Sequence, residues 1–286
     1  MLWFLYSLLS GFFNATSDAF VKKVKLDDIY LISWARFLFV LPLLPIFLFF
    51  TKIPTLDAVF WKTMSIFAPL DIVLLLLYIK AIRMSPLSLT LPFFSLTPVF
   101  LILTSFLILG ELPTFLGVAG IILVVIGAYI LNLNQKKYGI LGPFKAIFKE
   151  KGTILIIIAA LIASITANLL KIAVLHSSPT FFIAIHSIIF TTLMSIFFFK
   201  RIKNKFNDIK NNFGLLFLIG IANGFMFLFH ALAVTLVIVP YMISIKRTSS
   251  IFGVIYGGIW FKEKYFAQRL VGAAIMVVGA VVILIS

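Results

Sequence analysis

Long apolar segments alternate with short polar connectors along the whole chain. Ten segments are long enough to cross the hydrocarbon core of a bilayer, which takes a helix of about 20 residues. They are Leu2–Val21, Ile29–Phe50, Met64–Ile82, Leu87–Leu109, Thr114–Leu133, Thr153–Leu175, Thr180–Phe199, Phe213–Thr235, Ile238–Phe261 and Ala267–Ile285. Helices satisfy their own backbone hydrogen bonds in lipid. The pattern therefore predicts an all-α polytopic membrane protein with ten transmembrane helices.

Composition places nearly the whole chain in the membrane. Of its 286 residues, 63% are hydrophobic and 12% are charged, and the mean hydropathy is +1.19. A soluble domain is about half apolar and about a quarter charged. Ten spans leave room only for connectors, which excludes a separate soluble catalytic domain, and we expect neither enzymatic activity nor a cofactor. The chain has no cysteine, which excludes disulfides and cysteine metal sites, and no metal is expected.

Basic residues are distributed very unevenly among the connectors. The net charge of +15 would suggest a nucleic-acid partner in a soluble protein, but in a membrane chain it indicates orientation and surface charge. Eighteen lysines and arginines fall in the odd-numbered connectors, whereas the even-numbered ones contain only Lys52 and Lys62. Basic connectors stay in the cytoplasm. We therefore expect a multi-pass protein of the cell membrane, without a nucleic-acid partner, whose termini both lie outside the cytoplasm.

The two halves of the chain repeat each other. A shift of 152 residues pairs Glu111 with Glu263, Gly120 with Gly272, Gly127 with Gly279 and Asp71 with Asn223. Each half contains five spans, and because five is odd the second half must enter the membrane inverted. Inverted repeats are a transporter architecture, with the substrate site near the midplane between the halves. We expect a first repeat at 1–133, a basic linker at 134–152 and a second repeat at 153–286.

Short motifs add a family resemblance over essentially the whole chain. They are Ser85-Pro86-Leu87-Ser88, Leu96-Thr97-Pro98-Val99-Phe100 and Gly110-Glu111, with Phe261-Lys262-Glu263-Lys264 in the second copy. With these features the chain resembles the EamA type of the drug/metabolite transporter superfamily. The resemblance implies two five-helix repeats and secondary transport. Members of the superfamily move amino acids, other metabolites, drugs, sugar phosphates and nucleotide sugars, so the substrate stays open.

A narrower resemblance concerns the sixth and ninth spans. The ninth contains Lys246 and Arg247, and the sixth contains Lys171. Plastid sugar-phosphate translocators are similar, with a Lys-Arg pair in the ninth helix that is used for the phosphate and a lysine in the sixth. The resemblance implies an anionic substrate held by these three residues.

Ionisable side chains within the spans are the main candidates for chemistry, because each costs ~2.5–3.5 kcal/mol at mid-bilayer and usually faces a cavity or a partner. The charged candidates are Arg36, Asp71, Lys171, Lys246 and Arg247, and the titratable ones are His186 and His230. Four are positive and one is negative. An alternative role for some of them is mutual pairing, as of Arg36 or Arg247 with Asp71.

Lys246 and Arg247 lie roughly nine residues inside a span and cannot easily reach the interface. We expect at least one of them to contact the substrate. Lys246 and Ser250 share a stripe with Gly253 and Gly257, at spacings of four, seven and eleven residues, where small residues leave room for a ligand.

A second polar stripe on the sixth helix comprises Ser164, Asn168 and Lys171. Interhelical hydrogen bonding explains the serine and asparagine equally well. Lys171 is only about one turn from the end of its span, so that its ammonium could instead reach the interface.

Coupled transport requires either side chains that bind and release protons or exchange of the substrate for a counter-substrate. Asp71 is the leading candidate for a proton site, and its repeat partner Asn223 shows that a neutral group fits there. His186 and His230 are further candidates, although a lone membrane histidine is more often a packing residue. Asn14 and Asp18 lie near the cytoplasmic end of the first span. Small multidrug exporters place a glutamate in that helix, and its absence here counts against cation export.

Three functions remain open at this point. The leading one is a secondary transporter that moves a small, anionic metabolite, phosphorylated or carboxylated, by alternating access. The second is export of amino acids or other zwitterions, in which the cations hold the carboxylate. The third is flipping of an anionic lipid. In each case the partners are a small molecule and the lipid bilayer.

Overall fold

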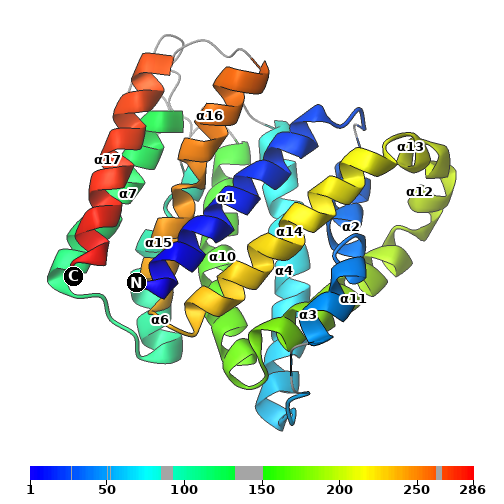
Figure 1. Ribbon diagram of the computed structural model, residues 1–286, viewed down its shortest axis with the longest axis horizontal. Helices are drawn as coiled ribbons and strands as arrows, with labels where there is room; N and C mark the ends of the chain where they lie inside the picture. The colour runs from blue at the N-terminus through cyan, green and yellow to red at the C-terminus, as the bar shows by residue number, and fades with distance from the viewer. Residues whose placement is uncertain (27, 50, 52, 85–92, 133–150, 262–265) are drawn as a thin grey trace.

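A computed structural model describes residues 1–286 apart from 27, 50, 52, 85–92, 133–150 and 262–265 (Figure 1). The described residues form helices and contain no strand. The helices are α1 (Leu2–Lys23), α2 (Ile29–Leu38), η1 (Leu41–Leu43), α3 (Leu44–Phe49), α4 (Ala58–Met84), α6 (Thr97–Leu109), α7 (Phe115–Asn132), α10 (Lys151–Leu175), α11 (Pro179–Phe197), α12 (Phe199–Asn204), α13 (Phe206–Asn211), α14 (Phe213–Val234), α15 (Val239–Arg247), α16 (Ser249–Phe261) and α17 (Phe266–Leu284).

Helices fall on all ten predicted segments. Five stretches of the described residues are long and apolar enough to cross a membrane by themselves: Ile29–Phe49, Ala58–Tyr78, Lys151–Leu175, Pro179–Phe197 and Phe213–Val234. The apolar helices α6 and α7 are shorter. The start of the predicted fourth span, with the motif at 85–88, lies outside the described residues, as do the basic linker at 134–150 and the motif at 262–264.

The second span is broken where proline interrupts it. Helix α2 ends at Leu38, four residues before Pro42, and the chain continues through a short 3-10 turn into α3. Proline has no N–H group and its ring clashes with the preceding turn, so the regular ladder cannot run through. The amide of Asn223 on α14 donates to the free Arg36 carbonyl at 3.4 Å.

The ninth span is also interrupted, at Thr248 between α15 and α16. The Thr248 hydroxyl donates to the carbonyl of Ile245 at 2.7 Å, an arrangement in which the side chain competes with the helical backbone. The predicted stripe therefore spans two helices, with Lys246 in the last turn of α15 and Ser250 in the first turn of α16.

The inverted repeat is visible in the helix packing. Under the 152-residue shift α1 corresponds to α10, α4 to α14 and α6 to α16, and α1 packs on α14 and α16 just as α10 packs on α4 and α6. Helices α7 and α17 correspond to each other and lie antiparallel, side by side (Figure 1). A Cβ atom on Gly127 would lie 2.7 Å from the Gly272 carbonyl oxygen, so this close approach requires glycine. The packing is that of two inverted five-helix repeats.

Ion pairs join connectors of the same parity. Asp28, in the connector after the first span, accepts from Arg201 at 2.5 Å and lies 3.5 Å from Lys205, both in the seventh connector. Asp57 in the second connector pairs with His176 in the sixth at 2.6 Å. Both chain termini lie at the same end of the bundle (Figure 1). The first connector thus lies beside the seventh, and the second beside the sixth.

Candidate functional site

Helix α15 brings two cations into the interior between the halves. Pro240 sits in its first turn, where its missing N–H costs nothing, and Lys246 and Arg247 form its last turn. The Lys246 ammonium lies 2.9 Å from His230 Nδ1 and 3.1 Å from the sulfur of Met226, both on α14. An ammonium only donates, so His230 Nδ1 accepts and the ring carries its proton on Nε2. That Nε2 atom is buried and has no partner among the described residues.

Arg247 is held from the first repeat. Its Nη2 donates to the hydroxyl of Thr97 at 2.8 Å, at the start of α6. The guanidinium carbon lies 4.4 Å above the ring of Phe94, a cation–π contact. The Nε atom is buried without a hydrogen-bond partner in the part of the chain that the structure describes. One of the guanidinium donors is therefore unused.

Neither of these cations has a carboxylate within ion-pair distance among the described residues. Lys171 differs, because its ammonium lies 2.5 Å from Glu111 Oε1 and donates to the Val237 carbonyl at 2.8 Å. Glu111 Oε2 in turn accepts from the N–H of Val239, the first residue of α15. Lys171 is thus neutralised, and it ties α10 to two connectors.

Asn168, the other candidate on α10, is fully bonded. Its side-chain oxygen accepts from Ser105 at 2.6 Å, and its nitrogen donates to Thr104 at 3.2 Å and to the Ser164 carbonyl at 2.9 Å. These contacts join α10 to α6, which is the interhelical role that the sequence left open. Ser250 lies half-buried in the first turn of α16.

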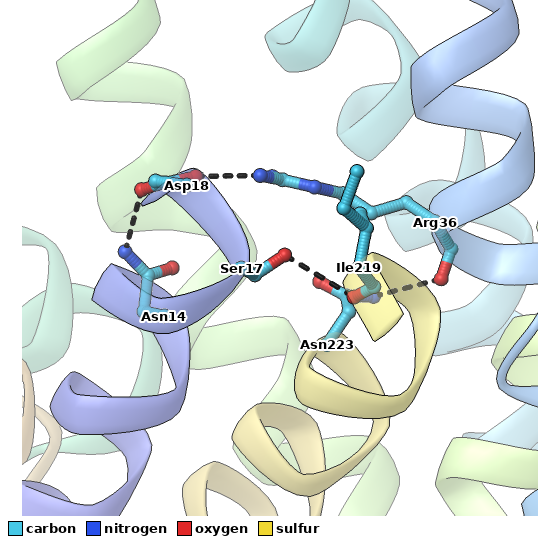
Figure 2. Close-up of polar contacts among 6 residues, drawn as sticks. All are labelled: Asn14, Ser17, Asp18, Arg36, Ile219 and Asn223. Carbon is cyan, nitrogen blue, oxygen red and sulfur yellow. Dashed lines mark hydrogen bonds and ion pairs between the residues drawn. The ribbon is translucent and has the colours of Figure 1, made fainter. Parts of the chain in front are cut away.

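A second charged group lies on α1 and α2. Figure 2 shows Asp18 and Arg36 directed toward each other from these helices, with Arg36 Nη2 2.5 Å from Asp18 Oδ1. The amide of Asn14, one turn earlier on α1, donates to Asp18 Oδ2 at 3.1 Å. Arg36 Nε is buried and has no partner among the described residues.

Among the described residues Asp71 pairs with a histidine and not with Arg36 or Arg247, which corrects the alternative suggested by the sequence. Its Oδ2 lies 3.2 Å from Nε2 of His186 on α11. The His186 ring is 1% exposed and contacts the rings of Phe37, Phe67, Phe182, Phe190 and Phe227. The Asp71 side chain is 19% exposed. Two of the three predicted coupling residues, Asp71 and His186, therefore form one dyad, whose histidine is enclosed by aromatic rings.

Tyr78 lies next to the Arg247 contacts, because its ring is 5.0 Å from that of Phe94, over which the Arg247 guanidinium lies. Tyr78 and Thr97 were absent from the predicted site. A tyrosine near the end of an apolar span and a threonine at a helix start are common, and neither is distinctive in one sequence.

Glu111 and Asp18 were also missed as partners. Both could have been found, since only nine acidic residues are present and buried cations usually require counter-charges.

The model of the EamA-like transporter family matches residues 1–133 and 150–285. A solved protein crystal structure superimposes with a TM-score of 0.69 at 14% sequence identity, over 99% of this chain and 96% of that one. It shows the same fold. No curated protein matches this chain.

Proposed function

The chain belongs to the EamA-like transporter family, a family of membrane transporters of small molecules and not of enzymes, and we propose that it moves a small anionic metabolite by alternating access. The observation that carries the proposal is the juxtaposition of Lys246 and Arg247 without an ion-pair partner among the described residues. Two partly buried cations without an ion-pair partner are costly in a bilayer, and an anionic substrate would offset that cost.

The donor set suits phosphate or carboxylate. Lys246 supplies a compact ammonium, Arg247 a planar fork, and His230 an N–H on its free side. Groups of this kind form charge-assisted hydrogen bonds to anionic oxygens, roughly twice as strong as neutral ones. Arg36 contributes a third cation to the same region. Lys171, already bonded to Glu111, supports the geometry of α15 instead of binding the substrate.

Alternating access is supported by the inverted repeats and by the two interrupted spans. The breaks at Phe39–Leu43 and at Thr248 lie close to Arg36 and Arg247. Irregular backbone of this kind marks substrate sites in transporters with inverted repeats. Glu111, in the fourth connector, bonds Lys171 and Val239 of the second repeat. These bonds hold the two halves together at this end of the bundle.

Asp71 and His186 are the proposed coupling pair. A carboxylate and an imidazole at hydrogen-bond distance can bind or release a proton together. The pair on α4 and α11 has no titratable counterpart in the other repeat, where Asn223 occupies the position of Asp71. His230 is bonded to Lys246. It would transmit a change of charge at the Asp71–His186 pair to the anion centre.

The orientation follows from the connector charges. We propose that both termini face away from the cytoplasm, with the linker inside. Reporter fusions at Ser286 and Lys145 test this arrangement, and a cytoplasmic signal at Ser286 would contradict it.

Binding of inorganic phosphate by the purified full chain tests the anion centre. Arg247→Gln and Lys246→Gln remove a charge-assisted hydrogen bond each, worth about 1.5–3 kcal/mol, so phosphate affinity should fall about tenfold to hundredfold. Lys62→Gln, which removes one exposed lysine from α4, is the matched control and should leave affinity unchanged. Unaltered affinity in both folded variants would sink the proposal. Phosphate exchange in proteoliposomes distinguishes solute transport from lipid flipping.

A further inference from the structure

Asp18 is exposed at a position where its helix is otherwise buried. Helix α1 contacts its neighbours through Ser7, Ser10, Gly11, Ala15 and Ser17, all of which are buried. At about 100° per residue, Asp18 falls near the centre of that same face. Its side chain is nevertheless 56% exposed. The exposed carboxylate therefore lies on the face of α1 that is turned toward the bundle and away from the surrounding lipid.

Neighbouring contacts define this interior face. The hydroxyl of Ser10 donates to the Met226 carbonyl at 3.0 Å and that of Ser17 to the Ile219 carbonyl at 3.2 Å, which fixes α1 against α14 (Figure 2 shows the second contact). On the other flank, a Cβ atom on Gly11 would lie 3.0 Å from the Lys246 carbonyl oxygen. Asp18 thus lies on the arc of α1 between α14 and the helix that carries Lys246.

The Asp18–Arg36 pair is incompletely bonded on both sides. The carboxylate accepts one hydrogen bond from Arg36 and one from Asn14 (Figure 2), although two carboxylate oxygens offer about four acceptor positions. The Arg36 guanidinium has five donors, its side chain is 23% exposed, and its buried Nε is unpartnered among the described residues. Each partner can therefore exchange the other for a different group.

The pair lies beside the helices that form the proposed anion centre. The Ser10 hydroxyl on α1 donates to the Met226 carbonyl, and the sulfur of Met226 lies 3.1 Å from the Lys246 ammonium. About one turn before Met226, Asn223 on α14 bonds the Arg36 carbonyl. Asp71 already lies beside His186. Among the described groups, Asp18 is therefore the acidic group bonded to a cation of this region.

We propose that Asp18 is a tethered counter-anion, which holds Arg36 while the site is empty and releases it to an anionic substrate. This inference rests on the proposed anion centre at Lys246 and Arg247. A phosphate group presents several charged oxygens to the Arg36 fork, whereas the displaced carboxylate, which is already half-exposed, turns away from Arg36. Asp18 thereby weakens binding of every anion and sets how much negative charge a substrate needs in order to compete. It is a specificity-determining residue of the site.

The test measures inorganic phosphate binding by the purified full chain at one fixed pH. Asp18→Asn keeps the size of the side chain and removes its charge, so phosphate should bind about tenfold more tightly, which corresponds to about 1.4 kcal/mol. Arg36→Gln should weaken binding about tenfold. The double variant should bind like Arg36→Gln alone, because the effect of Asp18 acts through Arg36. Asp208→Asn removes an exposed carboxylate from α13 and is the matched control, with unchanged affinity.

Each outcome has a distinct meaning. If the wild type binds phosphate and Asp18→Asn binds it equally or more weakly, the counter-anion role is wrong and the anion centre stands. Equal tightening with and without Arg36 would reduce Asp18 to a general field effect and overturn the exchange. Absence of phosphate binding in the wild type and in Asp18→Asn would contradict the anion centre and this inference together. Should Asp18→Asn fail to purify, Asp18→Ser makes the same charge change and carries the same expectation.

Discussion

Two interior lysines of this protein have opposite environments. Lys171 is bonded to a carboxylate, with side-chain exposures of 11% for the lysine and 15% for Glu111. Lys246 contacts a histidine nitrogen and a thioether, and its neighbour in sequence is another cation. The first lysine is neutralised where it lies and joins three segments of backbone. The second has no carboxylate within ion-pair distance among the described residues.

The contrast separates two uses of a charge in a membrane. A matched pair with additional backbone hydrogen bonds fixes geometry, because breaking it strands a charge. An unmatched pair of cations is a standing cost that a ligand can relieve. The sequence alone does not separate these cases, since Lys171 and Lys246 both appear as single lysines in apolar helices. Their partners distinguish them.

The largest expected effect comes from breaking the matched pair. Glu111→Gln leaves the Lys171 ammonium without its counter-charge, and loss of one partner of a buried ion pair costs about 3–5 kcal/mol. The thermal midpoint of the purified protein should fall by far more than in Lys246→Gln, where no ion pair is lost. Equal midpoints for the two variants would erase the distinction between structural and ligand-binding lysines.

A smaller effect is expected when the unmatched group keeps its charge but changes shape. Arg247→Lys preserves the positive charge and loses the planar fork, together with the bond to Thr97 and the stacking on Phe94. Phosphate affinity should fall about tenfold, with the thermal midpoint nearly unchanged. Wild-type affinity in Arg247→Lys would mean that charge alone suffices and that the fork is not used.

The helices and the inverted repeat were predictable because the bilayer imposes both. A span needs about 20 apolar residues, and an odd number of spans per repeat forces inversion. The break at Pro42 also has a sequence signal, whereas Thr248 has none. The sequence limits the candidate counter-charges to nine acidic residues, but it does not show which one meets which cation. Asp18 meets Arg36 only once two helices are packed, at side-chain angles that spacing along one helix does not determine. The guess of Asp71 with an arginine failed for that reason.

A third variant separates coupling from binding. Asp71→Asn places in the first repeat the residue that Asn223 provides in the second, so the protein should fold. The dyad with His186 can then no longer share a proton, and phosphate exchange should lose part of its pH dependence. The rate of phosphate exchange in proteoliposomes is measured for the variant and the wild type at each pH. The ratio of the two rates is then compared across pH, because the titration of phosphate itself cancels in that ratio. A ratio that stays constant from pH 5 to about pH 8 would assign Asp71 a purely structural role.

The smallest effect concerns an exposed ion pair outside the membrane spans. The N–H of Phe60 and then His176 hold the pKa of Asp57 below its ordinary value of 3.8. A carboxyl whose pKa is depressed by folding stabilises the protein above its unfolded pKa, and that contribution disappears as the pH falls through the folded value. Asp57→Asn keeps an acceptor for the Phe60 N–H but cannot titrate. Below about pH 4 the thermal midpoint of the wild type should therefore fall more steeply than that of Asp57→Asn, by less than the effect of Glu111→Gln, because water screens exposed pairs. Parallel midpoint curves for the two proteins would show that this pair contributes nothing measurable, unlike the interior pair of Lys171 and Glu111.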